Sequence, residues 1–346
     1  MKVFENNTNF TSMRKIRLLT MLLAVLILPL ISGCGKMMSE GEGGWVQVLY
    51  STGNTTTIPS QVNHLLSTKW DQDHPWNQKC PIDDGTHCKV GCVMVAMGQI
   101  MYYLNRNFGY PTALYETVYL SEDIPDNLYD QICLSNYNSS SSRWASMATN
   151  RSGTDAGIEY VEDFLASLGK QMHADYGSNE TTCAYVHDSD FNAFGIDCDG
   201  DNYDYDSVIS NLNSGKPVFA FAPYGSGATN SHAWVIDGYK NERTYYSVTY
   251  KFYYVEDLSE ISGSSYNGYG IVSTYTDEEM SVMFSYCYSG MEIIDSTSIL
   301  SKYFLMNWGE NGGSSDNVYY DASNWTYLSY QINNTDRHIF YNFSSL

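Results

Sequence analysis

Residues 90–105, VGCVMVAMGQIMYYLN, place Cys92 directly before an apolar segment with helical periodicity. From Val93 onward, apolar residues recur at positions 93, 97, 100, 101 and 104, which is the spacing of a helix that packs one face on a core. The stretch therefore predicts a buried helix with Cys92 in its first turn. Unpaired N–H groups and the helix dipole favour a thiolate at that end, whereas most buried cysteines are inert core residues.

The composition of the 346-residue chain restricts its class. Hydrophobic residues make up 43%, which is enough for a packed core in one large domain or two ordinary ones. The formal net charge is −21, which excludes a basic surface for nucleic acid or anionic lipid. No nucleic-acid partner is therefore expected.

The N-terminus has the pattern of an export signal. Residues 18–31, LLTMLLAVLILPLI, follow the basic sequence MRKIR and are too short for a membrane-spanning helix, which is typical of a secretory signal. The sequence then continues as LISGC, which resembles the lipobox of bacterial lipoproteins, in which the cysteine, here Cys34, is lipidated. The alternative is an ordinary secreted protein in which Cys34 has no special role.

These signals predict the location of the protein and the outline of its N-terminal part. Residues 1–33 form a signal peptide with a lipobox, which starts at Met1 or at Met13. Residues 34–59 follow as a flexible tether and a first strand, WVQVLY. The mature protein is then expected in the bacterial cell envelope, anchored by lipid to a membrane, with the outer membrane favoured and a periplasmic or cell-surface face.

The cysteine count bears on which thiol is reactive. With Cys34 lipidated, seven cysteines remain, and an odd number leaves at least one thiol unpaired. Export permits disulfides, and a Cys80–Cys88 pair would close a short loop. A zinc site made from Cys80, Cys88, Cys92 and His87 is disfavoured, because no second pair of ligands has the required spacing. The other cysteines of the folded part are Cys133, Cys183, Cys198 and Cys287.

A nucleophilic cysteine needs a base and a group that orients the base. The best base is His232 in NSHAWVIDGY (230–239), where it begins an apolar strand. Asn307 in YFLMNWGENGG (303–313) ends another apolar strand and is followed by Trp308. His232 lies 140 residues after Cys92, within the separation expected for a papain-type Cys, His and Asn order.

The segments GCVMVAMGQIMYY, SHAWVIDGY and NWGENGG resemble the three catalytic blocks of the streptopain family of papain-like cysteine peptidases. The segment HPWNQKCP (74–81) is similar to the family's short stretch with an oxyanion-hole glutamine, which would be Gln78. The resemblance implies an α+β, papain-like fold over residues 60–346. A helical half would bear Cys92, an antiparallel sheet or barrel half would bear His232 and Asn307, and the active-site cleft would lie between them.

The resemblance also implies a mechanism. Cys92 is the nucleophile and His232 exchanges the proton, while Asn307 or its neighbourhood orients the imidazole and Trp308 shields that contact from water. The oxyanion would be held by the Cys92 N–H and the Gln78 amide. No metal or organic cofactor is needed, the partners are protein or peptide substrates, and the enzyme would act as a monomer.

Three departures from the family pattern carry expectations of their own. Residues 241–300 form an insertion, rich in Tyr, Ser and Gly, that predicts extra strands or a flap. The family's NWGWGG is NWGENGG here, which puts a substrate-wall role of the glycine loop in doubt. Only 57 residues separate Cys34 from Cys92, too few for a large inhibitory pro-segment. Either control by a separate inhibitor protein or by tethering, or a low activity, is therefore expected.

The function predicted from these motifs is a cysteine endopeptidase that hydrolyses peptide bonds in extracellular proteins through an acyl-enzyme. Two alternatives stay open. One is a catalytically weak homologue that serves as a surface binding lipoprotein through the insertion. The other is a Cys–His amidase that acts on cell-wall peptides.

Overall fold

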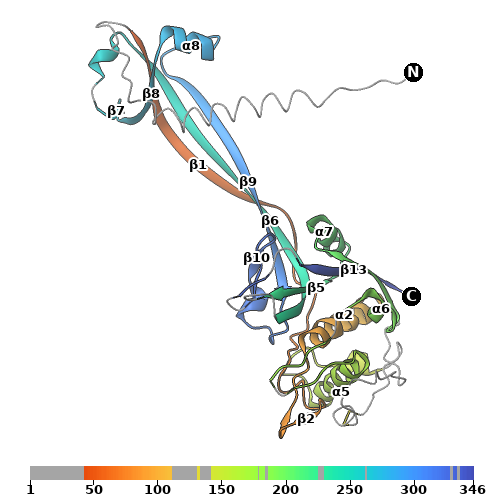
Figure 1. Ribbon diagram of the computed structural model, residues 1–346. Helices are drawn as coiled ribbons and strands as arrows, with labels where there is room; N and C mark the ends of the chain where they lie inside the picture. The colour runs from red at the N-terminus through yellow and green to blue at the C-terminus, as the bar shows by residue number, and fades with distance from the viewer. Residues whose placement is uncertain are drawn as a thin grey trace, which may run out of the picture. The chain divides into compact units, whose positions relative to one another are not determined.

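The computed structural model describes residues 43–110, 131–132, 142–177, 179–183, 186–224, 230–261, 263–327, 330–332 and 336–346. These fall into two compact units. One holds residues 43–54 and 246–297, and the other holds residues 55–245 and 298–346. Three strands contribute residues to both units (Figure 1): β1 (Gly44–Val62), β6 (Asn230–Val255) and β9 (Met291–Asn307). The predicted signal peptide, Cys34 and Cys133 lie outside the described residues.

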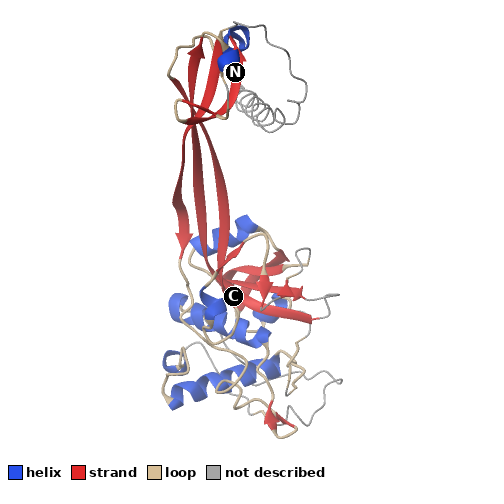
Figure 2. Cartoon of the chain, turned by 90° about the vertical axis from the view of Figure 1, so that its left-hand side faces the viewer, coloured by secondary structure: helices blue, strands red, loops and turns tan. Residues whose placement is uncertain are grey.

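The helix predicted at Cys92 is confirmed in the larger unit as α2 (Cys92–Phe108). It packs against α5 (Asp155–Gln171), which Thr154 caps by accepting the Gly157 N–H at 3.2 Å. A Cβ on Gly98 of α2 would lie 2.8 Å from a Leu165 methyl, so the close approach of these helices requires glycine there. Among the described residues, this unit also contains α4 (Ser142–Ser146), α6 (Asp188–Asn192) and α7 (Tyr205–Asn213). Figure 2 draws the helices in blue and the strands in red.

An antiparallel sheet forms the other half of the larger unit. Its order is β4-β13-β5-β6, with β9 on β6 and β10 on β9. The new strands are β4 (Ile196–Asn202), β5 (Val218–Tyr224), β10 (Tyr319–Asp321) and β13 (His338–Ser345). Two short hairpins form separate two-stranded sheets. In one, β2 (Ile82–Asp83) pairs with β3 (Thr86–His87), and in the other, β11 (Thr326–Tyr327) pairs with β12 (Tyr330–Gln331). The α+β class is therefore confirmed.

The central strand β6 is buried on both faces, and its side chains alternate between two cores. Ala233 and Val235 belong to the core that contains α2 and α5. Trp234 and Ile236 belong to a second core that contains Trp308. Because successive residues of a strand point to opposite faces, the stretch AWVI connects the helical layer to the loop that follows β9.

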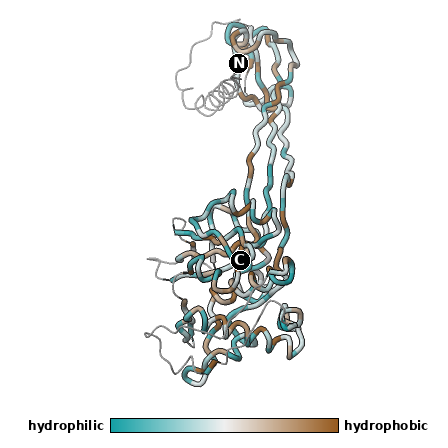
Figure 3. The backbone as a smooth tube through the Cα atoms, turned by 90° about the vertical axis from the view of Figure 1, so that its right-hand side faces the viewer, coloured by the Kyte–Doolittle hydropathy of each residue, from teal (hydrophilic) through white to brown (hydrophobic). Residues whose placement is uncertain are grey.

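The smaller unit is built on antiparallel pairing of β1 with β8 (Tyr269–Thr276), and β8 also pairs with β7 (Ser265–Tyr266). Helix α8 (Asp277–Met283) starts with a capping box between Thr276 and Glu279. Much of the predicted insertion, 241–300, thus forms strands and one helix. Hydrophobic and hydrophilic residues mix along these strands, which expose one face (Figure 3). Among the described residues, no helix is long and apolar enough to cross a membrane.

Candidate active site

Cys92 is the first residue of α2, and the preceding turn determines where its side chain points. Gly91 adopts a positive φ of 93°, and a Cβ there would lie 2.4 Å from the end of the Met94 side chain. Only glycine fits this turn without strain. The turn brings the Cys92 sulfur to the start of β6, where it accepts the Ala233 N–H at 3.4 Å. A partly exposed thiol therefore stands at the positive end of a buried helix.

His232 is the neighbour of Ala233 on β6, and it is only 3% exposed. Its ring packs beside the rings of Trp234 and Trp308, with centroid distances of 6.3 and 6.0 Å. The Nε2 atom lies 3.0 Å from the Trp308 backbone carbonyl, which can only accept a hydrogen bond. Nε2 therefore carries the proton, and in the neutral ring the lone pair is on Nδ1, which is the atom that can take up a proton.

Asn307 was expected to orient the imidazole of His232. In the structure, the Asn307 side chain instead contacts the peptide unit whose carbonyl faces His232. Asn307 Oδ1 accepts the Gly309 N–H at 3.1 Å, and this N–H shares a peptide unit with the Trp308 carbonyl that faces His232. Trp308 was expected to shield the hydrogen bond of the imidazole from water, and its own backbone carbonyl is the partner in that hydrogen bond. The neighbourhood of Asn307, and not its amide, touches His232.

The Asn307 amide also joins the sheet to α2. It exchanges two hydrogen bonds with Gln99, at 3.0 and 3.2 Å, and donates to the Thr68 carbonyl at 3.1 Å. Gln99 is fully buried and lies two helical turns after Cys92, on the same helix. This network fixes the helix that carries the thiol relative to the loop that holds the histidine.

We expect Gln99→Leu to destabilise the protein by about 1–3 kcal/mol, because it leaves buried amide groups of Asn307 without partners. Urea unfolding of the full chain measures the effect. In a double-mutant cycle with Asn307→Leu, the second substitution should cost less than it does alone. Strictly additive losses would show that the two amides are not coupled.

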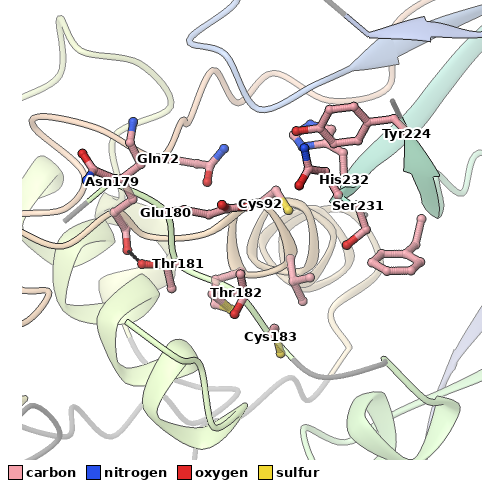
Figure 4. A pocket seen from close by; sticks show the side chains of 15 residues that line it. Gln72, Cys92, Asn179, Glu180, Thr181, Thr182, Cys183, Tyr224, Ser231 and His232 are labelled. Atoms are coloured by element: carbon pink, nitrogen blue, oxygen red, sulfur yellow. Dashed lines mark hydrogen bonds between the residues drawn. The ribbon is translucent and has the colours of Figure 1, made fainter. Parts of the chain in front are cut away.

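The cavity around Cys92 contains a different glutamine from the one predicted for the oxyanion hole. Gln72, and not Gln78, lines this cavity together with Cys92 and His232, as Figure 4 shows. The Gln78 side chain instead donates to Asn77 Oδ1 at 2.9 Å. Both glutamines belong to the same irregular segment, and the backbone of Gln72 is fixed because its carbonyl accepts the Val90 N–H at 3.0 Å.

The rest of the cavity comes from two parts of the larger unit. On the helical side, Asn179, Glu180 and Thr181 line it, while Tyr224 and Ser231 line it on the sheet side (Figure 4). Thr181 is tied to the segment before α2, because its hydroxyl donates to the Lys89 carbonyl at 2.6 Å. The cavity thus brings residues of the helical side and of the sheet side together around the Cys92 sulfur.

Burial determines the protonation states at rest. It raises the pKa of the Cys92 thiol above its ordinary value, although the Ala233 N–H favours the thiolate. It lowers the pKa of His232 to about 4, against the stabilising effect of the Trp308 carbonyl. A neutral thiol beside a neutral imidazole is therefore the resting form, and the ion pair forms by proton transfer within the site.

The other cysteines show what distinguishes Cys92. Cys183 lines the same cavity, but its thiol donates to the Met172 carbonyl at 3.4 Å, and burial raises its pKa to about 12. Cys80 and Cys88 are buried and not joined by a disulfide. No cluster of three metal-ligating side chains occurs within the described part of the chain. Cys92 alone among the described cysteines lies at the first turn of a helix beside the histidine.

Sequence reasoning missed Gln72, Gln99 and the role of the Trp308 carbonyl. Gln72 stands two residues after the buried Trp70, and this segment offered a second glutamine six residues later. Gln99 lies on the predicted helix, where a polar residue within an apolar face was the available signal. The carbonyl had no signal, because every residue has one.

A model of the Peptidase C10 family matches residues 70–251, which include Cys92 and His232. Streptopain of Streptococcus pyogenes serotype M28 is 26% identical over an alignment of 228 residues, and the match covers 57% of this chain and 54% of streptopain. Streptopain of serotype M1 matches over the same length with the same identity. The chain thus spans about half the length of the curated relatives it matches.

Two solved structures of a cysteine protease from Prevotella intermedia also match. Active wild-type interpain A is 20% identical, with a TM-score of 0.49, and the match covers 82% of this chain and 95% of that chain. A prointerpain A fragment is 20% identical, with a TM-score of 0.47, and the match covers 83% of this chain and 75% of that chain.

Proposed function

The chain belongs to the Peptidase C10 family, and from this premise we propose that it is a cysteine peptidase that hydrolyses peptide bonds in extracellular proteins. Its helices bear Cys92 and its antiparallel sheet bears His232, as in a papain-like fold. One observation carries the proposal. The Cys92 sulfur and His232 line one cavity from these two elements, with Nε2 of His232 held by a backbone carbonyl.

The first half of the proposed reaction forms an acyl-enzyme. Cys92 gives its proton to Nδ1 of His232, and the sulfur attacks the carbonyl carbon of the scissile peptide. The negative oxygen of the tetrahedral intermediate is held by the Cys92 N–H and the Gln72 amide. The C–N bond then breaks, His232 protonates the leaving amine, and the acyl group stays on sulfur as a thioester.

The second half releases the acyl group. A water molecule loses a proton to His232 and attacks the thioester carbon. The same two donors stabilise the second tetrahedral intermediate. The C–S bond breaks, the carboxylic acid product leaves, and the proton on His232 returns to the Cys92 sulfur. The cycle is balanced without a cofactor.

Labelling with an epoxide-type thiol inhibitor, combined with casein cleavage, tests this function. Wild-type protein is expected to cleave casein, to lose that activity on labelling, and to carry the label on Cys92. Cys183 is the matched control in the same cavity and is expected to remain unlabelled, because its thiol donates to the Met172 carbonyl and not to an imidazole. A wild-type protein that resists the label and leaves casein intact would sink the proposal.

The same experiment separates the two alternatives. A surface binding lipoprotein would react slowly and cleave neither casein nor peptidoglycan fragments. An amidase would be labelled on Cys92 but would act on peptidoglycan fragments and not on casein. Action as a monomer and control by a separate inhibitor protein stay predictions.

We also propose that the mature protein is lipid-anchored in the cell envelope through Cys34. The support is the apolar segment that ends in LISGC. Mass spectrometry of the N-terminal peptide from a bacterial host is expected to find acyl chains on Cys34. In the Cys34→Ser variant the protein should move from the membrane fraction to a soluble one. An unmodified Cys34 in the wild type contradicts the anchor and leaves the peptidase proposal intact.

The pH profile should reflect the burial of His232. Its pKa is lowered to about 4, so the imidazole remains a base until the pH falls that far. Full loss of kcat/KM is therefore expected near pH 4 and not near 6.5, the ordinary value for histidine. Peptide hydrolysis in buffers of constant ionic strength measures this, with circular dichroism to verify folding at each pH. Complete inactivity already at pH 6 in folded protein contradicts the prediction.

A further inference from the structure

The direction of the Trp308 carbonyl determines where His232 points, and two side chains fix that carbonyl. The peptide after Trp308 is held by Asn307, which accepts the Gly309 N–H at 3.1 Å. The peptide before Trp308 is held by Asp316, whose Oδ1 accepts the Trp308 N–H at 2.7 Å. With both peptide planes fixed, the backbone dihedrals of Trp308 cannot change without breaking a buried hydrogen bond.

We propose that Asp316 is a positioning residue for the peptidase reaction: it clamps the Trp308 backbone so that the Trp308 carbonyl holds the His232 ring. This inference rests on the proposed function. No sequence motif assigned a role to Asp316. Its carboxylate acts on the imidazole through the backbone and not by direct contact.

The altered glycine loop gives Asp316 its position. Asp316 lies on a 3-10 helix (Ser314–Asn317) that begins after the loop GENGG, and its N–H donates to the Gly313 carbonyl at 3.1 Å. Gly312 in the loop has a φ of 63°, and a Cβ there would lie 2.6 Å from the Lys69 side chain. The loop therefore brings Asp316 next to the Trp308 backbone. This role differs from that of a wall of the substrate site.

The burial of Asp316 lowers the folding stability of the protein. The residue is 5% exposed, and no lysine, arginine or histidine among the described residues forms an ion pair with it. Burying a carboxylate without a cation normally destabilises a protein. The carboxylate is therefore kept at a cost in stability at the position where its Oδ1 accepts the Trp308 N–H.

The surroundings of Asp316 predict that it titrates within the working range. Burial raises its pKa to about 6, while the Trp308 N–H favours the charged form. Above that pH the carboxylate is mostly charged, and below it the charge is lost. The titratable and charged groups that face it are Glu310 and Tyr320 from its own loop and β10, Asp237 from β6, and His64 and Lys69 from the segment after β1.

The test compares Asp316→Ala and Asp316→Asn with the wild-type full chain. Asp316→Ala is expected to lower kcat about 10–100-fold with little change in KM, because the cavity around Cys92 is untouched. Alkylation of Cys92 by iodoacetamide at pH 7 should slow by a similar factor. Asp316→Asn keeps an acceptor for the Trp308 N–H and should recover part of both rates. The step near pH 6 in the wild-type alkylation profile should be absent from both variants.

A matched control is Asp204→Ala. Asp204 also holds a backbone N–H, that of Ser207 at 2.8 Å, but at the start of α7. Thermal unfolding should show a loss of stability for this variant, with the wild-type alkylation profile unchanged. If Asp316→Ala fails to fold, Asp316→Asn alone carries the test through its pH profile.

Two results are decisive in opposite ways. The positioning role is overturned if folded Asp316 variants keep the wild-type kcat and the wild-type alkylation profile. The other result is a wild type that is alkylated readily at Cys92, faster than the Asp316 variants, but cleaves no casein. In that case the proposed function fails while the positioning role stands.

Discussion

Cys92→Ala is expected to reduce kcat/KM for a peptide substrate by about 10⁶-fold, because it removes the nucleophile that forms the thioester. The sulfur is the only described thiol that lies at a helix start beside His232. What activity remains would come from the Gln72 amide, the Cys92 N–H and substrate binding. Hydrolysis of a fluorogenic peptide measures the loss, with the background rate of the buffer subtracted.

The matched control is Cys183→Ala, which removes the second thiol of the same cavity. This variant should retain activity within about threefold of wild type, because burial keeps Cys183 protonated. Similar losses in both variants would indicate that the cavity is sensitive to any change in packing, and the assignment of Cys92 as nucleophile would then be unsupported.

Gln72→Ala is expected to lower kcat about 100–1000-fold, which is typical for the loss of one oxyanion donor. KM should change little, since the donor contributes mainly to the transition state and not to the bound substrate. Gln78→Ala is the matched control, because it removes the same side chain six residues later in the same segment. Its amide donates to Asn77, so its loss should leave kcat near wild type.

The two glutamine variants also discriminate between the sequence motif and the structure. If Gln78→Ala lost kcat and Gln72→Ala did not, the assignment from the motif would be right and the assignment from the cavity wrong. Circular dichroism and thermal unfolding of both proteins establish that a loss of kcat is not a loss of fold.

Much of the fold and part of the site follow from local sequence patterns. The helix from Cys92 was predictable because its apolar residues repeat at helical spacing over four turns. His232 was predictable as a strand residue because a buried β-strand needs an uninterrupted apolar run such as AWVI. These patterns are short-range, since they depend only on which face of an element meets the core.

The groups that complete the site have no such pattern. Gln72 and Gln78 lie in an irregular segment, where the direction of a side chain depends on the path of the backbone and not on a period. Asn307 was recognisable by its position after a strand, yet its partners, Gln99 and Gly309, are set by how the sheet meets α2. The holder of His232 is a backbone carbonyl, which no residue type marks.

The sequence by itself determined the helix that mounts Cys92, the strand that carries His232 and the family to which both belong. The tertiary structure decided which glutamine lines the cavity. It also decided that Asn307 contacts the peptide between Trp308 and Gly309, and that Asp316 lies next to the Trp308 N–H. The physical reason is that the periodicity of apolar residues reports which face of a single helix or strand is buried. A hydrogen bond between distant segments depends instead on how those elements pack, and their order in the chain does not determine their distance in space.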